Sequence, residues 1–322
     1  MDSRFDAIFR PLRIKTVTLR NRIVVPPMLQ LRPITSRQGI AWYRRLAAGG
    51  AAMVIIEGTA ISRFESELTA DNLAPLAAAI HEQGATAVMQ LSPPKFDRPQ
   101  VPDTLTGQRV ERLAEQYALA TRICRGAGFD GVEPHGAHGF LLNQFFMPDR
   151  NHRADRYGGS LENRCRLAVQ IVQQIRLCTD DAMVVLYRHT PRGEAYGIEE
   201  SVVLAKRLVE AGVDVLDISP AQDKAVADLA EPFRGLGVPV IAVGGLEDPA
   251  ASAQAIDAGR CDLVALGRQL IRDAEWPNKV HEDRLAEVGR CEKCNQGCYG
   301  NIRKGLPVVC VHWSGQELAA FL

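Results

Sequence analysis

The sequence lacks a long hydrophobic run, a net charge and a secretory leader. No apolar stretch approaches the ~20 residues that cross a bilayer, and residues 1–10 mix both charge signs without an apolar segment, so we expect neither a membrane span nor a signal peptide. The 38 Lys and Arg balance the 38 Asp and Glu, which disfavours a broad nucleic-acid-binding or anionic-membrane surface. We therefore predict a cytoplasmic protein without nucleic-acid or membrane partners.

Internal repeats, low-complexity segments and long linkers are also absent from the 322 residues. This length fits two average domains, or one α/β barrel of roughly 250 residues with an extension. A chain of this size buries about three quarters of its unfolded surface, so a large core is available.

What the sequence does contain is a series of short, nearly continuous apolar runs, as expected for parallel strands buried on both faces. The eight runs are Ile23–Met28, Met53–Gly58, Thr86–Leu91, Gly131–His135, Met183–His189, Val213–Ser219, Val238–Gly245 and Cys261–Gly267. Between most of them, apolar residues recur at three- and four-residue spacing, which predicts helices. The predicted helices are Asp71–Gln83, Val110–Ala127, Ser160–Cys178, Glu199–Ala211 and Asp248–Ala258.

Eight strands alternating with helices favour a (β/α)8 TIM barrel over an open doubly wound sheet, which remains the alternative. We expect residues 1–287 to form the barrel, and residues 10–20 to form a small hairpin that closes its floor. The pattern changes after residue 287, where residues 288–322 form a Cys- and Gly-rich tail.

Active sites of such barrels lie at the carboxyl ends of the strands. Several polar residues and glycines fall there: Glu57, Gly58, Gln90, His135, His138, Arg188, Gly244, Gly245, Gly267 and Arg268. The Gly-Gly and Gly-Arg pairs after the last two strands indicate a phosphate site, because glycine lets the backbone approach an anion and Arg268 can neutralise it. Tight turns without a ligand are the alternative.

The other polar residues allow more than one interpretation. Arg188 in a buried strand requires an anion, which could be a negatively charged ring or carboxylate or a structural Glu. His135 and His138 could donate paired hydrogen bonds, bind zinc or be plain loop residues, and no third zinc ligand is evident. Gln90 could bind an imide edge or cap a turn.

One long block of sequence resembles a known family. His135-Gly-Ala-His-Gly-Phe-Leu-Leu-Asn-Gln-Phe-Phe-Met-Pro and the following residues 151–166 look like the signature of the old yellow enzyme family of FMN-dependent oxidoreductases. Further matches include residues 9–14, 21–28, 243–246 and 266–268, so that the resemblance covers about residues 8–312.

The resemblance implies residue roles that agree with the strand-end residues. It implies that the ring of noncovalent FMN is held by Pro26, Pro27, Met28, Gly58, Gln90 and Arg188, and its phosphate by Gly244, Gly245, Gly267 and Arg268. It implies that His135 and His138 hydrogen-bond a substrate oxygen and stabilise the charge that hydride transfer creates. The matching Asp155, Tyr157, Glu162, Asn163 and Arg164 are interpreted as structural.

Four of the eight cysteines crowd into the tail, and disulfides are disfavoured in the cytosol. Cys291, Cys294, Cys298 and Cys310 are separated by two, three and eleven residues. This spacing resembles the 4Fe-4S site of 2,4-dienoyl-CoA reductases and trimethylamine dehydrogenases, and four thiolates on one loop can hold such a cluster. A zinc ribbon is the alternative.

Two departures from the family concern the substrate side. Phe140 stands where the family has a proton-donating tyrosine, and phenylalanine cannot supply a proton; Tyr196 or a solvent chain could replace it. The segment Ser92–Leu105 is short and lacks the family's His-x-Gly-Arg, so the flavin's substrate side is expected to be more open or covered by a partner.

No Gly-x-Gly-x-x-Gly motif follows the cysteines. We therefore expect an external electron donor, a ferredoxin or a reductase subunit, with NAD(P)H as an indirect source. Electrons would pass through the cluster to FMN and as hydride to an activated C=C of a small-molecule substrate (enone, enoate or enoyl thioester), or in reverse. The alternatives are a catalytically degenerate barrel that relays electrons or serves as a structural subunit, and a zinc-stabilised barrel reduced directly by NAD(P)H. A homo-oligomer stays open.

Overall fold

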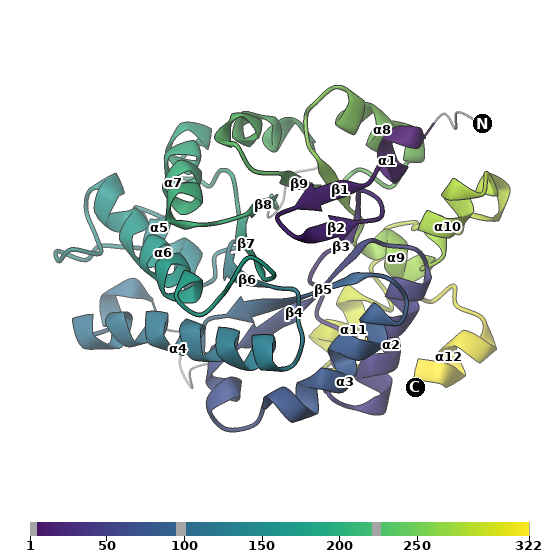
Figure 1. Ribbon diagram of the computed structural model, residues 1–322, viewed down its shortest axis with the longest axis horizontal. Coiled ribbons are helices and arrows are strands. Elements are labelled where there is room, and N and C mark those ends of the chain that lie inside the picture. The colour runs from purple at the N-terminus through teal and green to yellow at the C-terminus, as the bar shows by residue number, and fades with distance from the viewer. Residues whose placement is uncertain (1–4, 95–100, 221–226, 322) are drawn as a thin grey trace.

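The computed structural model describes residues 5–94, 101–220 and 227–321. Its centre is a closed barrel of eight parallel strands in the order β10-β3-β4-β5-β6-β7-β8-β9 (Figure 1). The strands are β3 (Ile23–Val25), β4 (Met53–Ala60), β5 (Thr86–Ser92), β6 (Gly131–Gly136), β7 (Val184–His189), β8 (Val215–Ile218), β9 (Val240–Val243) and β10 (Leu263–Ala265). Each predicted apolar run supplies one strand, and the predicted (β/α)8 barrel is confirmed.

Helices surround the barrel, as Figure 1 shows. They are α1 (Asp6–Phe9), α2 (Arg37–Ala48), α3 (Ala70–His81), α4 (Gly107–Gly126), α5 (Leu141–Phe146), α6 (Leu161–Arg176), α7 (Ile198–Ala211), α8 (Pro249–Asp257), α9 (Arg268–Arg272), α10 (Trp276–His281), α11 (Tyr299–Arg303) and α12 (Gly315–Phe321). All five predicted helices are present with shifted ends. The side chain of Ser160 caps α6 and that of Asp248 caps α8, because each accepts an orphan backbone N–H of the first turn.

Helix α2 is absent from the sequence-based prediction. Its N-cap signal is present, since Ser36 accepts a hydrogen bond from the backbone N–H of Gly39. The helix contains three arginines, and its apolar residues Trp42, Tyr43 and Leu46 occupy one narrow buried stripe. The arginines interrupt the apolar pattern along the chain, so the stripe is easily missed.

The hairpin predicted at residues 10–20 is confirmed as the antiparallel pair β1 (Leu12–Ile14) and β2 (Val17–Leu19). Ile14 and Leu19 are buried in a cluster with inward-facing strand residues such as Met53, Val184 and Val215. The hairpin therefore closes the floor of the barrel, and the site must form at the opposite end.

The end of β4 differs from the predicted end at Gly58. β4 continues to Ala60, two residues past Gly58, and its pairing with β5 shifts register between Ile56 and Thr59. Glu57 and Gly58 therefore lie on a bulge inside the strand. A bulge re-aims the side chains it carries, and the sequence offers no turn residue that announces it. Gln90 likewise precedes the end of β5 at Ser92.

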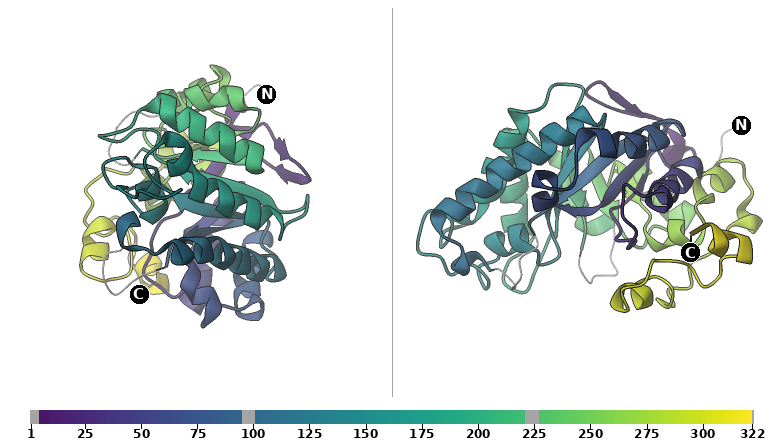
Figure 2. Two further views of the ribbon diagram at one scale, coloured as in Figure 1. Left: turned by 90° about the vertical axis from the view of Figure 1, so that its left-hand side faces the viewer. Right: turned by 90° about the horizontal axis from the view of Figure 1, so that it is seen from below.

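The tail after residue 287 lies on one side of the barrel (Figure 2, yellow), where it contacts the segments that follow β3 and β10. Buried Arg32 donates hydrogen bonds to the backbone oxygens of Val308 and Phe321, and the indole of Trp313 donates to the Ile271 oxygen at 2.8 Å. These contacts fix the tail to the same end of the barrel as the strand-end polar residues.

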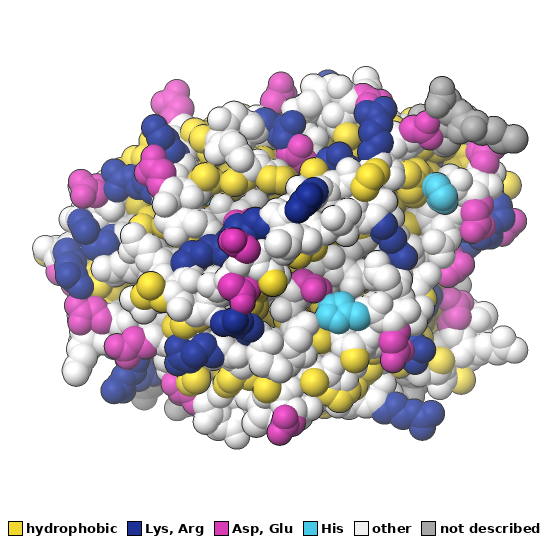
Figure 3. Space-filling view, viewed as in Figure 1, with side chains coloured by type: hydrophobic (Ala, Val, Ile, Leu, Met, Phe, Trp, Pro, Cys, Tyr) yellow, Lys and Arg dark blue, Asp and Glu magenta, His cyan; other side chains and the backbone are white. Residues whose placement is uncertain are grey.

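Basic and acidic side chains are interspersed on the face that carries the hairpin (Figure 3). Among the described residues, none of the helices combines the length and the apolar character that crossing a membrane requires.

Candidate active site

The candidate site begins with a layer of polar side chains inside the barrel. Gln90, Arg188 and Asp217 each lie two residues after an inward-facing apolar residue, and side chains two apart share one face of a strand. Strand pairing sets Gln90 beside Glu133 and Arg188 beside both His135 and Asp217. All five side chains are buried, so β5 to β8 hold one polar layer above the apolar interior.

Two histidines lie at the upper edge of this layer. His138 has a left-handed backbone with φ of 60°, and its Nε2 lies 2.9 Å from Ser219 Oγ. The rings of His135 and His138 meet edge to face at 5.4 Å. The Nδ1 of His135 is buried without a hydrogen-bond partner among the described residues. This free ring nitrogen is a candidate contact for a ligand.

Both histidines are neutral in the resting protein. Burial lowers the pKa of His135 strongly and that of His138 to about 4, and the nearby Arg188 adds to both effects. A neutral imidazole carries one N–H, so each ring can donate one hydrogen bond without bringing a charge. The pair is suited to holding a substrate oxygen.

Arg188 meets a carboxylate as well as the open end of the barrel. Its Nη2 donates to Ser219 Oγ at 2.8 Å, and its Nε lies 3.4 Å from Asp217 Oδ2. The carboxylate beside Arg188 is Asp217 and not the Glu considered from the sequence, and a contact of Arg188 with a ligand stays a prediction. Ser219 joins the arginine to His138 through the two contacts that it makes.

Gln90 is held from below and faces Gly58. Its Nε2 donates to Glu133 Oε1 at 2.7 Å. A Cβ placed on Gly58 would lie 2.9 Å from Gln90 Oε1 and 2.5 Å from Ser92 Oγ. Only glycine fits at this point, as expected where a ligand or another chain segment comes close.

The Gly244-Gly245 pair after β9 and the Gly267-Arg268 pair after β10 form a second part of the site. Gly244 and Gly245 have φ of 103° and 69°, which favour glycine, and a Cβ on Gly244 would meet no atom within 4 Å. Gly267 lies beside Pro26 and Met28, whose Cγ and Sδ atoms would contact its added Cβ at 3.7 and 3.5 Å. The predicted phosphate and ring segments are thus brought together, with Pro27 between Pro26 and Met28.

Tyr196 packs against the rings of Phe146 and His189. Its hydroxyl donates to the Thr190 backbone oxygen at 2.9 Å and accepts from Asn143 Nδ2 at 3.2 Å. Burial raises its pKa. Phe140, which occupies the family's tyrosine position, is half exposed, with its ring 4.6 Å from that of His135.

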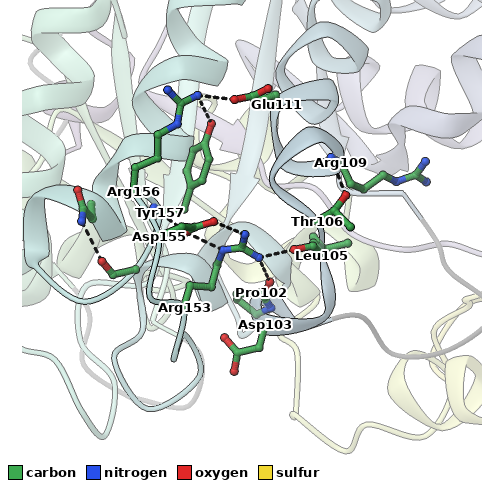
Figure 4. Close-up of polar contacts among 12 residues, drawn as sticks. Pro102, Asp103, Leu105, Thr106, Arg109, Glu111, Arg153, Asp155, Arg156 and Tyr157 are labelled. Carbon is green, nitrogen blue, oxygen red and sulfur yellow. Dashed lines mark hydrogen bonds and ion pairs between the residues drawn. The ribbon is translucent and has the colours of Figure 1, made fainter.

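The residues interpreted as structural fix the rim beside this site (Figure 4). Arg153 pairs with Asp155 and donates to the backbone oxygens of Pro102 and Leu105. Arg164 donates to the Phe146 oxygen at 2.6 Å. The loop between α5 and α6 is therefore held against the connection that follows β5. Residues 95–100 of that connection lie outside the described residues.

The four tail cysteines line one pocket. Cys291, Cys294, Cys298 and Cys310 surround a space of about 340 Å³, including its open mouth, with Arg268 on the same wall. Lys293 and Asn295 have left-handed backbones, and Gly297 passes so close to Val309 that a Cβ would lie 2.6 Å from its oxygen. These features curl the loop around the pocket.

The pocket adjoins the segment that begins with Gly267 and Arg268. Arg268 Nη1 donates to Asn295 Oδ1 at 2.7 Å, and the Cys291 N–H donates to Gln269 Oε1 at 3.0 Å. Within the described residues, no three His, Cys, Asp or Glu side chains converge as ligands of a single metal ion. The thiolates of an iron–sulfur cubane bind separate irons, so their arrangement differs from that of a single-ion site.

Sequence reasoning misses Glu133 and Asp217. Both are fully buried, and a signal is available, because a charged residue inside a continuously apolar strand is costly without a partner. Both lie inside predicted strands, whereas the rule for barrel sites points to the residues at the strand ends. Ser219 is likewise missed, although it ends a predicted strand.

The chain is similar to known flavin oxidoreductases in sequence and in fold. The sequence pattern of the NADH:flavin oxidoreductase / NADH oxidase family matches residues 7–97 and 92–287. The chain is 32% identical to the NADH oxidase of Thermoanaerobacter brockii, over 92% of this chain and 54% of that protein. It is 29% identical to the cinnamate reductase of Clostridium sporogenes, over 96% of this chain and 58% of that protein.

Among solved structures, a complex of 2-naphthoyl-CoA reductase has the same fold, with a TM-score of 0.87 and 22% identity over 95% of this chain and 56% of that one. The chain spans a little over half the length of these two curated relatives.

Proposed function

Because the chain belongs to the NADH:flavin oxidoreductase / NADH oxidase family, we propose that it is an FMN-dependent oxidoreductase with a 4Fe-4S cluster. Its substrate is a small molecule with an activated C=C, as in an enone, enoate or enoyl thioester, or the corresponding saturated compound in the reverse direction. The name of the cinnamate reductase supports this substrate class. FMN supplies hydride transfer when bound, and the cluster supplies single electrons.

The residues present fit FMN. Gly244 offers open space beside Gly245, and Arg268 can pair with a phosphate. Gln90 and Arg188 supply an amide oxygen and a cation for the polar edge of the ring, and the missing side chain of Gly58 leaves room for the ends of Gln90 and Ser92.

His135 and His138 would bind the substrate oxygen. Two neutral N–H donors stabilise the negative charge that develops on that oxygen as the neighbouring C=C is reduced. The Tyr196 hydroxyl donates a hydrogen bond to the Thr190 backbone oxygen, which favours solvent as the source of the proton that Phe140 cannot supply.

The cysteine pocket carries the assignment of the cluster. Four cysteines line one pocket that shares Arg268 with the phosphate segment, so a cluster there would lie next to the flavin. Cys294 is exposed, which supports electron delivery from outside the chain. We propose a ferredoxin or a reductase subunit as the donor, with NAD(P)H as its indirect electron source.

The test is anaerobic purification followed by measurement of iron, sulfide and FMN, with spectra recorded after NADH, NADPH or reduced ferredoxin. We expect one FMN and four irons per chain. Cys294→Ser should lose iron and keep FMN, whereas Cys178→Ser, outside the tail, should keep both. Absence of both FMN and iron would refute the proposal, and zinc in place of iron would select the zinc-stabilised barrel.

Substrate turnover separates the enzyme from an electron relay. Photoreduced protein should be reoxidised by an enone, an enoate or an enoyl thioester. Reoxidation by a redox protein alone would favour the degenerate barrel.

A further inference from the structure

Two carboxyl groups of the polar layer, on β6 and β8, take no part in the roles assigned above. Glu133 on β6 and Asp217 on β8 are each 0% exposed. Glu133 Oε2 and both carboxyl oxygens of Asp217 have no donor partner among the described side chains. Two such groups cannot both be ionised at close range without a large electrostatic cost.

A single proton resolves this arrangement. The two carboxyls are close enough to hydrogen-bond each other, and such a bond needs one of them to be an acid. Burial raises the pKa of Glu133 strongly, and Asp217 raises it further against the opposing effects of Arg188 and Gln90. Burial also raises the pKa of Asp217, but Arg188 and the bond from Glu133 lower it. The cation beside Asp217 stabilises the carboxylate form there, which leaves the proton on Glu133.

The neighbours of the pair agree with this assignment. Arg188 Nε lies 3.4 Å from Asp217 Oδ2, so the cation stands beside the carboxylate. The other titratable groups of this region, His135 and His138, are neutral. The polar layer then holds one positive and one negative charge and is neutral as a whole.

We propose that Glu133 and Asp217 share one proton, with Glu133 as the acid and Asp217 as the carboxylate, and that this pair positions Gln90 and balances the charge of Arg188. The part that concerns the flavin rests on the function proposed above. Glu133 Oε1 accepts from Gln90 Nε2 at 2.7 Å, which fixes the amide so that its oxygen faces Gly58. The imide N–H of a ring at this end of the barrel needs an acceptor, and the amide oxygen of Gln90 supplies one once Glu133 holds the amide nitrogen.

Infrared spectroscopy tests the shared proton without any flavin. At neutral pH, wild-type protein should show one protonated carboxyl C=O band that shifts in D₂O. Glu133→Gln should lose this band, because glutamine replaces the acid while keeping its shape. Asp214→Asn is the control, since it removes a carboxylate just before the same strand β8, and it should keep the band.

Several infrared outcomes would overturn the proposal. The first is that wild type lacks the band, and the second is that the band persists in Glu133→Gln. The third is that the Glu133→Gln/Asp217→Asn double variant loses two bands, which would mean that both carboxyls are protonated.

FMN affinity and potential test the positioning role. Glu133→Gln should bind FMN within about threefold of wild type, because its amide oxygen still accepts from Gln90. Glu133→Leu should weaken binding at least tenfold, since it leaves that buried amide without an acceptor. Asp217→Asn should shift the flavin midpoint potential to more positive values, because Arg188 loses its counter-charge. Equal affinities of the Gln and Leu variants, or an unchanged potential, would refute this role.

The two sets of measurements fail separately. A protein that binds no FMN but shows the carboxyl band contradicts the proposed function and keeps the shared proton. A protein that binds FMN without the band does the reverse.

Discussion

The pKa of a buried histidine makes the stability of this barrel depend on pH. His189 at the end of β7 is 2% exposed, and its Nε2 lies 2.9 Å from Ser201 Oγ. Burial lowers its pKa to about 4, against a smaller opposing effect from the Gly136 backbone. The folded protein therefore holds this ring neutral where an unfolded chain would protonate it.

The free energy of unfolding should fall as the pH is lowered from 6.5 to 4. In this window the unfolded chain binds more protons than the folded one, so protonation favours unfolding. A pKa lowered from 6.5 to about 4 corresponds to about 3 kcal/mol for His189. His189→Gln should make the pH dependence shallower in urea unfolding, and the exposed His281→Gln should not. Parallel curves for His189→Gln and wild type would contradict the expectation.

Gly58 is a residue whose missing side chain matters. Gly58→Ala places a methyl group 2.5 Å from Ser92 Oγ and 2.9 Å from Gln90 Oε1, so both side chains must move. We expect FMN affinity to fall about three- to tenfold, with a smaller change in stability, as measured by flavin titration and thermal unfolding. Gly235→Ala, whose methyl group would meet no atom within 4 Å, is the control. Unchanged FMN affinity would show that Gln90 does not contact the ring.

At the scale of elements, periodicity predicted the strands well because each is buried on both faces and therefore continuously apolar. It could not predict the bulge at Glu57 and Gly58, since register depends on pairing with β5. It also missed α2, whose arginines obscure a short apolar stripe.

The same limit applies to the site. Glycines and polar residues at strand ends were identifiable because parallel strands place those ends together. The proposed partnership of Glu133 and Asp217 was not, because it links two strands that are separated by β7.

The segment that begins α9 links two sites. Arg268 Nη1 donates to Asn295 Oδ1 at 2.7 Å, and its guanidinium lies 5.7 Å from the centre of the Tyr299 ring. Arg268→Gln should weaken FMN binding at least tenfold while riboflavin affinity changes less than threefold, because only FMN carries the phosphate. Arg303→Gln on α11 is the control. Equal losses for both ligands would assign Arg268 to the ring or to the fold instead.

Over the whole molecule, the tail and the barrel are joined by buried aromatic and cationic groups. Trp313 is 4% exposed, packs 6.0 Å from Trp42 of α2 and lies under the guanidinium of Arg45 at 4.5 Å. Arg45 also pairs with Glu317 at 2.8 Å. These contacts between aromatic rings and the Arg45 guanidinium fix the cysteine pocket against the barrel.

Trp313→Ala should therefore weaken the binding of iron without weakening the binding of FMN. Truncating a buried tryptophan costs about 3–5 kcal/mol when the site cannot collapse, and here the cost falls on the contact that holds Cys310 in place. We expect a lower midpoint of thermal unfolding and loss of iron, while FMN stays bound because its residues lie on the strands and their loops. Leu177→Ala, at a 79% exposed position, should change neither. Loss of FMN and iron in equal proportion would mean that barrel and tail unfold as one unit, and retention of iron would mean that the remaining contacts, such as those of Arg32, suffice to hold the pocket.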